Sequence, residues 1–313
     1  MAEILVCSKR GGFSPVGYRR IDVTSHAKDI FRTCSPFFAG PVGLYGDFVA
    51  KNVENGYQYA KVYSKFIGKD GNPTPDYFEW AKQGWDDAVA HRRPLGYIKP
   101  KYSWWNGEKL DYIQSRERIY IPLYSKAVVK TEGFKELQRL YAAGEHLCLL
   151  DYDAYDYQAL GYTMDDIIHD PEHTLGHCFV LKFLLEGLLP MPHPFRVIIA
   201  GGRDFDDYLL LCEFADKVLC RKVVDGIEIV CGMAKGADTL GERYAKERGY
   251  PIQYFPADWK LYGKQAGYIR NKQMGNYADA LIAFWDGNSH GTKHMIDYME
   301  SLHKPIRVKS YRK

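Results

Sequence analysis

Several features that mark membrane, secreted and disulfide-built proteins are missing from this sequence. No apolar run approaches the roughly 20 residues that a membrane-spanning helix requires, and the basic residues of MAEILVCSKRGGF follow the apolar patch, which reverses the order of a secretory signal. The seven cysteines are scattered, odd in number and without a CxxC pair, so we expect reduced thiols. We therefore expect a cytoplasmic protein without a membrane partner, located in the host cytoplasm if a phage encodes it.

An excess of charge of one sign is also missing. The 42 Lys and Arg residues nearly balance the 39 Asp and Glu residues, and a net charge of +3 is too small to indicate nucleic-acid binding by bulk electrostatics, although local basic patches remain possible. Hydrophobic residues at 46% and charged residues at 26% exclude a disordered or fibrous chain. With 313 residues, the chain is about twice as long as a usual domain, so we expect two domains, with one large domain as the alternative.

A proline-rich segment divides the chain. Between Gly187 and Pro194, three prolines fall within five residues, which breaks a helix and favours an extended connector. An apolar helical pattern precedes this segment at 179–189, and an apolar strand pattern follows it at 195–200. We place the boundary near residue 192, with one domain at 1–190 and the other at 195–313.

The second domain alternates strand and helix patterns, which is typical of a doubly wound, parallel α/β sheet of the Rossmann type. Strands are predicted at 197–200, 227–231, 252–255, 280–285 and 306–308, and helices at 206–221, 239–248, 265–274 and 292–302. In the first domain, helices are predicted at 52–66, 74–91, 125–143 and 174–188, with one apolar strand at 147–150. We expect a mostly helical α+β fold there.

Three glycine-rich turns follow predicted strands of the second domain, at 201–204, 232–238 and 286–292. Glycine lets backbone N–H groups approach an anion at the start of the next helix, although tight turns also need glycine for structural reasons alone. Ligands of open α/β sheets bind beyond the carboxyl ends of the strands. Three such turns at one edge favour a nucleotide or phosphate site.

Five motifs in order make this half of the chain similar to the SLOG superfamily: GGRDF, GMAKGADTLGERYA, FPADW, AGYIRNKQM and AFWDGNSHGTKHMI. The resemblance implies a cleft for nucleotides or nucleotide-derived ligands. Because the PGGxGTxxE signature of SLOG hydrolases is missing from the sequence, we expect a binding module. The cleft residues implied by the resemblance are Gly201, Arg203, Gly232, Gly236, Asp238, Arg270, Asn271, Ser289, Gly291 and Thr292.

Two polar segments stand out in the first domain. On a helix, Glu54, Gln58 and Lys61 would share one face with Tyr57 close by, and the alternative is a solvated polar stripe. The acidic run 151–157 directly follows the apolar strand, where carboxylates are well placed for a site. Such a run also binds divalent cations or is simply solvated, but the EF-hand spacing does not occur in it.

The order of these segments resembles the NADAR family over roughly residues 17–189. Ser35-Pro36-Phe37 is similar to an early S-P-F stretch, and Glu54 to Lys61 is similar to the helix E-H-x-x-Q-x-x-K, with Asn55 where many members carry His. Residues 149–156 resemble L-V-E-A-S-P-x-D, and residues 173–181 resemble N-x-L-G-K-x-L-M.

The NADAR resemblance implies N-glycosidic chemistry on ribosylated bases. Cleavage at the anomeric carbon develops oxocarbenium-like charge, which carboxylates stabilise while one of them activates water. The implied catalytic residues are Glu54, Lys61 and one aspartate among Asp151, Asp153 and Asp156, and Lys61 would hold a phosphate or react as an amine. The implied substrate-binding residues are Ser35, Phe37, Tyr57, Gln58, Arg116 and Gly176.

The sequence therefore predicts an N-glycosidase that hydrolyses the bond between ADP-ribose and guanine in nucleic acid, in the setting of phage–host conflict. Its partners would be ADP-ribosylated nucleic acid or an ADP-ribose-like nucleotide, with a second nucleotide at the SLOG domain, and a homo-oligomer is allowed. The alternatives are a glycosidase for a small phosphoribosyl metabolite and a sensor that sequesters an NAD-derived nucleotide. We expect no cofactor and no metal, because the His173/His177 pair lacks a third ligand at a matching spacing.

Overall fold

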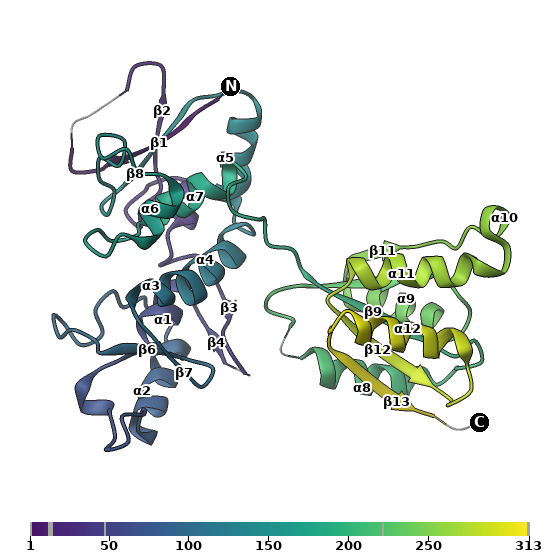
Figure 1. The fold of residues 1–313 in the computed structure, drawn as a ribbon. Coiled ribbons are helices and arrows are strands. Elements are labelled where there is room, and N and C mark those ends of the chain that lie inside the picture. The colour runs from purple at the N-terminus through teal and green to yellow at the C-terminus, as the bar shows by residue number, and fades with distance from the viewer. Residues whose placement is uncertain (1, 12–14, 47, 221, 312–313) are drawn as a thin grey trace. The chain divides into compact units, whose positions relative to one another are not determined.

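The computed structural model describes residues 2–11, 15–46, 48–220 and 222–311. The chain divides into two compact units, one up to Pro192 and the other from His193 onward (Figure 1). Each unit has an apolar core of its own. Within the described residues, no helix is long and apolar enough to cross a membrane.

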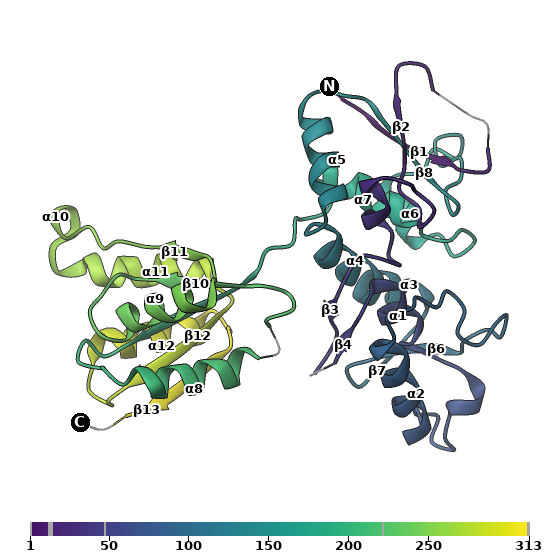
Figure 2. The ribbon, with the colours of Figure 1, turned by 180° about the vertical axis from the view of Figure 1, so that it is seen from behind.

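The C-terminal unit is a five-stranded parallel sheet in the order β11-β10-β9-β12-β13, with helices on both faces, as Figure 2 shows. The strands are β9 (Phe195–Gly201), β10 (Ile227–Cys231), β11 (Ile252–Tyr254), β12 (Ala280–Trp285) and β13 (Ile306–Ser310). The helices are α8 (Tyr208–Leu219), α9 (Ala237–Arg248), α10 (Trp259–Tyr262), α11 (Ala266–Tyr277) and α12 (His290–Ser301), and a 3-10 turn, η4 (Gly263–Gln265), precedes α11. The predicted doubly wound α/β fold is confirmed.

Strand β9 is buried on both faces of the sheet. Successive side chains of a strand point to opposite faces, so Ile199 packs with Tyr244 of α9 in one core. Its neighbour Ile198 packs on the other face with Met274 of α11 and Met295 of α12. A strand that is covered on both faces reads as a continuous apolar run, which explains why this pattern was visible in the sequence.

The strand order places the topological switch point between β9 and β12. The chain continues from β9 to β10 on one side, whereas β12 continues to β13 on the other. The connections that leave the carboxyl ends of these two strands therefore diverge, and a crevice for a ligand opens between them.

The N-terminal unit combines three small sheets with helices, which confirms the predicted α+β class. Its parallel sheet has the order β1-β8-β2, while β3-β4 and β5-β6-β7 are antiparallel. The strands are β1 (Ile4–Ser8), β2 (Arg19–Asp22), β3 (Val42–Gly43), β4 (Val49–Ala50), β5 (Lys61–Val62), β6 (Tyr102–Trp105), β7 (Glu108–Leu110) and β8 (Leu147–Asp151). The helices are α1 (Val53–Gln58), α2 (Pro75–Asp86), α3 (Tyr112–Ser115), α4 (Ile121–Val128), α5 (Glu132–Ala142), α6 (Met164–His169) and α7 (His177–Leu185), with the short 3-10 helices η1 (Ile30–Cys34) and η2 (Ser64–Phe66) and the π-helix η3 (Arg116–Tyr120).

The helix predicted at 52–66 is wrong beyond the end of α1. The Tyr77 hydroxyl donates one bifurcated hydrogen bond, shared between the carbonyl oxygens of Tyr59 (3.2 Å) and Ala60 (3.1 Å). This tertiary bond occupies carbonyl groups that a continued helix would use, and Lys61 starts strand β5 instead. The three polar residues expected on one helix face therefore come from a helix and a strand.

The helix predicted at 125–143 is two helices, α4 and α5. The second begins at an N-cap, because the Thr131 side chain accepts a hydrogen bond from the Phe134 N–H (3.2 Å). Strands β1 and β2, which the sequence did not predict, flank β8 in the parallel sheet. They are short, and β2 has exposed residues, so their apolar patterns are weak.

Gly236 offers a test of how closely the loop before α9 packs against the switch point. Gly236 has φ +80°, and a Cβ on it would lie 2.2 Å from the carbonyl oxygen of Gly202 and 2.7 Å from the carbonyl carbon of Arg203. Because backbone cannot move aside cheaply, we expect Gly236→Ala to lower the free energy of unfolding of the C-terminal unit by at least about 1–3 kcal/mol. Urea titration followed by circular dichroism measures this loss.

The control is Gly249→Ala, because Gly249 also has a positive φ (+68°) but meets nothing within 4 Å of its Cβ position. This variant isolates the cost of the backbone conformation. Equal losses of stability in the two variants would contradict the close packing of the Gly236 loop.

Candidate functional site

A cavity of about 600 Å³ opens in the N-terminal unit. Its wall comes from α1, β5, η3, the start of α7 and the connections that follow β2, η1, α2 and β8. The sequence-predicted residues that line it are Ser35, Phe37, Glu54, Tyr57, Gln58, Lys61, Arg116, Asp151 and Asp153. The fold thus gathers side chains that lie far apart in the sequence around one space.

Glu54, Gln58 and Lys61 form a hydrogen-bonded chain in this wall. Gln58 Nε2 donates to Glu54 Oε1 (3.0 Å), and Lys61 Nζ donates to Gln58 Oε1 (2.7 Å). The Lys61 ammonium also lies 4.5 Å from the centre of the Tyr57 ring. Both ends of the Gln58 amide are engaged by protein partners, so Gln58 aligns the carboxyl group of Glu54 and the amine of Lys61.

Burial shifts Glu54 and Lys61 toward their neutral forms. The Glu54 residue is 6% exposed, and desolvation raises the pKa of its carboxyl group despite the Gln58 hydrogen bond and the Lys61 charge. Desolvation also lowers the pKa of Lys61 to about 8, although the Glu54 carboxylate opposes that shift. A carboxyl group with a raised pKa keeps its proton closer to neutral pH, as a general acid requires.

Asp151 is held in the opposite, ionised state. Its Oδ2 lies 2.9 Å from Nδ1 of His177 and accepts a longer hydrogen bond from the Cys178 N–H (3.4 Å) at the start of α7. Burial by itself would raise the pKa of Asp151, but the His177 charge and the Cys178 donor outweigh burial and hold that pKa far below its usual range.

His177 carries the matching positive charge. Its Nε2 donates to the carbonyl oxygen of Val23 (2.8 Å), while its Nδ1 faces the Asp151 carboxylate. Both ring nitrogens face acceptors, an arrangement that favours the doubly protonated ring. Burial disfavours the imidazolium, but the Asp151 carboxylate and the Val23 carbonyl raise the pKa of His177 above its ordinary value.

A second ion pair joins two segments of the wall. Arg92 Nη2 lies 2.8 Å and 2.9 Å from the two carboxylate oxygens of Asp153. Arg92 belongs to the segment 88–101 between α2 and β6, and Asp153 lies in the loop after β8. We call 88–101 the basic segment, because its four Lys and Arg residues are accompanied by no Asp or Glu.

Asn55 anchors the start of the basic segment to helix α1. This residue is fully buried, and its Nδ2 donates to the carbonyl oxygens of Asp87 (3.0 Å) and Val89 (2.8 Å). Its Oδ1 accepts a hydrogen bond from the His91 N–H (2.8 Å). Asn55 is next to Glu54 in the sequence, so the helix that carries the general-acid candidate also holds the basic segment in place.

Arg116 is a buried cation in the same wall, at 1% exposure. Its Nη1 donates to the carbonyl oxygens of Ile168 (3.0 Å) and Asp170 (2.6 Å), and its Nη2 donates to the Tyr112 hydroxyl (2.8 Å) and to the His173 carbonyl oxygen. These acceptors are neutral oxygens, so they orient the guanidinium without cancelling its charge. Arg116 starts the π-helix η3, and π-helical turns are frequent at functional sites.

Two predicted residues lie outside the cavity wall. Asp156 is exposed, and its Oδ1 accepts a hydrogen bond from the Ala159 N–H (3.0 Å). Gly176 lies behind Asp151, because a Cβ on Gly176 would be 2.8 Å from Asp151 Oδ2. Gly176 therefore leaves room for that carboxylate instead of contacting a ligand.

The lining residues that were not predicted as site residues from the sequence include Arg92, Tyr120 and His177. The basic segment is the signal that could have pointed to Arg92. His177 was weighed as a metal ligand, whereas its partners are Asp151 and Val23. Among the described residues, no cluster of three or more His, Cys, Asp or Glu side chains could hold a metal ion.

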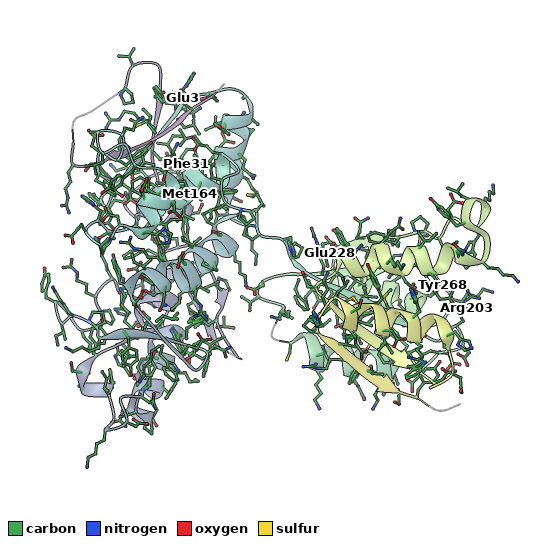
Figure 3. The ribbon with its side chains drawn as sticks, viewed as in Figure 1. Glu3, Phe31, Met164, Arg203, Glu228 and Tyr268 are labelled. Carbon is green, nitrogen blue, oxygen red and sulfur yellow. The ribbon has the colours of Figure 1, made fainter. Side chains whose placement is uncertain are left out.

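A second cavity, of about 630 Å³, lies at the switch point of the C-terminal sheet. The predicted residues that line it are Gly201, Arg203, Asp238, Arg270, Asn271, Ser289, Gly291 and Thr292. Arg203 and Tyr268, which also lines this cavity, are labelled at the same end of the unit in Figure 3. The wall thus comes from the loops after β9, β10 and β12 and from α11.

Asp238 is a buried carboxyl group in this second cavity, at 4% exposure. Desolvation raises the pKa of Asp238 to about 6, although the charges of Arg270 and Arg203 oppose that rise. Arg270 Nη1 lies 3.8 Å from Asp238 and also donates to the Gly232 carbonyl oxygen. Two guanidinium groups around one carboxyl group suit an anionic ligand.

Gly232 and Gly236 lie behind the wall of the second cavity and do not line it. A Cβ on Gly232 would be 2.5 Å from Arg270 Nη1 and 2.7 Å from Asp238 Oδ2. A Cβ on Gly236 would meet the backbone of the loop after β9. Both glycines therefore make room for lining residues.

The C-terminal unit contains a SLOG-type domain. Residues 195–262 match the family model described as the YspA, cpYpsA-related SLOG family, which confirms the resemblance read from the motifs. The chain is 32% identical over 117 residues to the Gene 61 protein of Mycobacterium phage D29, an alignment that covers 36% of this chain and 93% of the phage protein. The chain therefore belongs to the family of that phage protein.

The assignment of the N-terminal unit to NADAR is wrong. Residues 15–164 match DUF6939, described as a family of unknown function. The resemblance rested on four short, spaced motifs, and in the motif around Glu54 the expected helical spacing is broken by the start of β5 at Lys61. No solved structure matches the chain.

The Asp151–His177 pair predicts a pH-dependent stability. Because the pKa of Asp151 is lowered, its contribution is present above about pH 4 and is lost as pH falls through the folded pKa. Because the pKa of His177 is raised, its contribution is present below about pH 6.5 and is lost as pH rises through the folded pKa. We expect Asp151→Asn to cost roughly 3–5 kcal/mol between these limits, because a buried charge then lacks its partner.

Urea unfolding of the parent and Asp151→Asn proteins at pH 5.5 and at pH 9 measures this difference, which should be smaller at pH 9. Asp156→Asn is the control, because the Asp156 carboxylate is exposed in the same loop. A stability gap that does not depend on pH would show that the pair is not charged as described.

The Arg92–Asp153 pair predicts a change in proteolysis. Trypsin cuts after Arg92 but not after Arg93 or Lys99, because proline follows both of the latter. An exposed ion pair is worth about 0.2–1 kcal/mol, so Asp153→Asn should speed cleavage after Arg92 roughly 1.5- to 5-fold by freeing the basic segment. Mass spectrometry of early fragments gives the rates, with Asp156→Asn as control. Identical rates in all three proteins would argue against this tether.

Proposed function

We propose that the N-terminal cavity is the active site of an N-glycosidase that acts on a ribosylated nucleotide, and that the C-terminal SLOG unit binds a nucleotide. The observation that carries the enzymatic part is the contrast between Glu54 and Asp151. These two carboxyl groups line one cavity, yet the pKa of Glu54 is raised and the pKa of Asp151 is lowered. Environments that separate two carboxyl pKa values in this way assign an acid and an ionised partner.

The chemistry follows from these two states. Protonated Glu54 gives its proton to the leaving base while the C–N bond breaks and its electron pair goes to the base nitrogen. The ionised carboxylate of Asp151 stabilises the oxocarbenium-like charge at the anomeric carbon, together with Asp153 in the same wall. Water then bonds to that carbon, and the Glu54 carboxylate takes the proton that the water releases.

The charge of the cavity favours an anionic substrate. Five Lys and Arg side chains line it, against three carboxyl groups, and one of these three, Glu54, is shifted toward its neutral form. The lining also includes seven aromatic residues: Phe37, Tyr57, Tyr63, Tyr97, Tyr112, Tyr120 and Tyr152. Cations and aromatic rings together suit the phosphates and the base of a nucleotide.

In its most specific form, the proposed substrate is ADP-ribose joined to guanine in nucleic acid. The basic segment supports a polymer, because it places Arg92, Arg93 and Lys99 on the cavity wall, and Tyr97 beside them is 88% exposed. Arg93 and Tyr97 also form a cation–π contact at 4.6 Å. A small phosphoribosyl metabolite is the alternative substrate, and a sensor for an NAD-derived nucleotide is the alternative without turnover.

The experiment incubates the protein with DNA that carries ADP-ribose on guanine and follows the release of free ADP-ribose by chromatography. Loss of a general acid typically costs 10²–10⁴-fold in rate, so Glu54→Gln should lower kcat roughly by that factor while substrate still binds. Glu79→Gln is the matched control, because Glu79 is an exposed carboxyl group on α2. It should keep the parent rate.

The other outcomes separate the alternatives. Release from a free phosphoribosyl substrate but not from DNA would favour the small metabolite. ADP-ribose binding in a titration without release from any substrate would favour the sensor. Equal rates for the parent and Glu54→Gln proteins would show that Glu54 has no role in the reaction.

A further inference from the structure

The second cavity has an aromatic end. Helix α10 carries Trp259, turn η4 carries Lys264, and the first turn of α11 carries Gly267 and Tyr268, and all four line the cavity. In Figure 1, α10 stands beyond the start of α11, away from the strands of the sheet. Trp259 and Tyr268 remain 53% and 44% exposed. A large indole that lines a cavity and is half exposed has surface available for a ligand.

The Trp259 ring is supported on one side by the chain itself. A Cβ on Gly267 would lie 3.4 Å from Cη2 of Trp259, so the edge of the indole rests close to the Gly267 backbone. Asp258 caps α10 by accepting a hydrogen bond from the Leu261 N–H (2.9 Å), which secures the turn that carries the indole. The ring is therefore positioned before any ligand arrives.

One face of α11 connects this aromatic end with the charged centre of the cavity. Gly267, Arg270, Asn271 and Met274 recur at intervals of three and four residues, so they share a face, and all four line the cavity. Three residues of a helix span about 4.5 Å along its axis. The turn of α11 that carries Arg270 therefore directly follows the turn that carries Gly267, which supports Trp259.

We propose that this cavity binds a nucleotide in one orientation, with its base stacked on Trp259 and its phosphate between Arg203 and Arg270. The inference rests on the proposed nucleotide binding of the C-terminal unit and adds the residue on which the base stacks. Stacking accepts every base, because each has a π face, and a guanidinium holds two phosphate oxygens at once. The ligand class is thus a nucleotide with little selectivity among bases.

The test measures binding of AMP, GMP and ribose 5-phosphate to the full chain by calorimetry. Base–aromatic stacking is worth about 1–3 kcal/mol by alanine substitution, so Trp259→Ala should weaken AMP and GMP roughly 5- to 150-fold. Ribose 5-phosphate has no base, and its affinity should not change. Trp259→Phe keeps an aromatic face and should stay within a few-fold of the parent.

Leu261→Ala is the matched control, because Leu261 is 67% exposed on the same helix and does not line the cavity. Unchanged AMP binding by Trp259→Ala would overturn the stacking and leave nucleotide binding intact. An equal loss of AMP and ribose 5-phosphate would overturn it too, since Trp259 would then only shape the cavity. A parent protein that binds none of the three compounds would instead contradict the nucleotide-binding function, and the inference with it.

Discussion

The buried ion pair between Asp151 and His177 is the interaction on which the N-terminal site depends. Asp151 ends β8, the middle strand of the parallel sheet, and His177 begins α7. The second nitrogen of His177 binds the Val23 carbonyl oxygen just beyond β2. One charged contact therefore joins the middle strand, a helix and the exit of a neighbouring strand. Removing either charge leaves the other buried without a partner, so the three segments must keep their arrangement together.

The fold of the C-terminal unit could be predicted from the sequence because it repeats one local pattern, an apolar strand followed by a turn and a helix. Strands β10 and β12 begin and end where their apolar runs do, since both faces of a central parallel strand are buried. The predicted site also follows from topology, because the turns after such strands meet at one edge. The motifs could not distinguish residues that line the cavity from residues that only make room for the lining residues. Gly232 and Gly236 lie behind the wall and give Asp238 and Arg270 their space, whereas Trp259 lies in it.

The N-terminal unit was harder to predict because its local patterns are overridden by tertiary contacts. The polar spacing around Glu54 predicted a helix that continues beyond Gln58. In the structure, the Tyr77 hydroxyl instead hydrogen-bonds the carbonyl groups that the next helical turn would use. Lys61 still reaches Gln58, from a strand instead of a helix. The residues of this site were thus recognisable by type, while their partners were not. Nothing in the sequence links His177 to Asp151, because that pairing exists only once α7 packs beside β8.

The charges of the N-terminal cavity also indicate how a ligand would lie in it. His177 and Arg92 are each compensated by a carboxylate, and Lys61 is shifted toward its neutral form. Arg116 is different, because the oxygens that bind it are carbonyl and phenol oxygens without formal charge. Its hydrogen-bond partners leave its positive charge in place, so an anionic group in the cavity is attracted toward it. Glu54 lines the same cavity, so under the proposed function a substrate with its phosphates toward Arg116 would also meet the candidate acid.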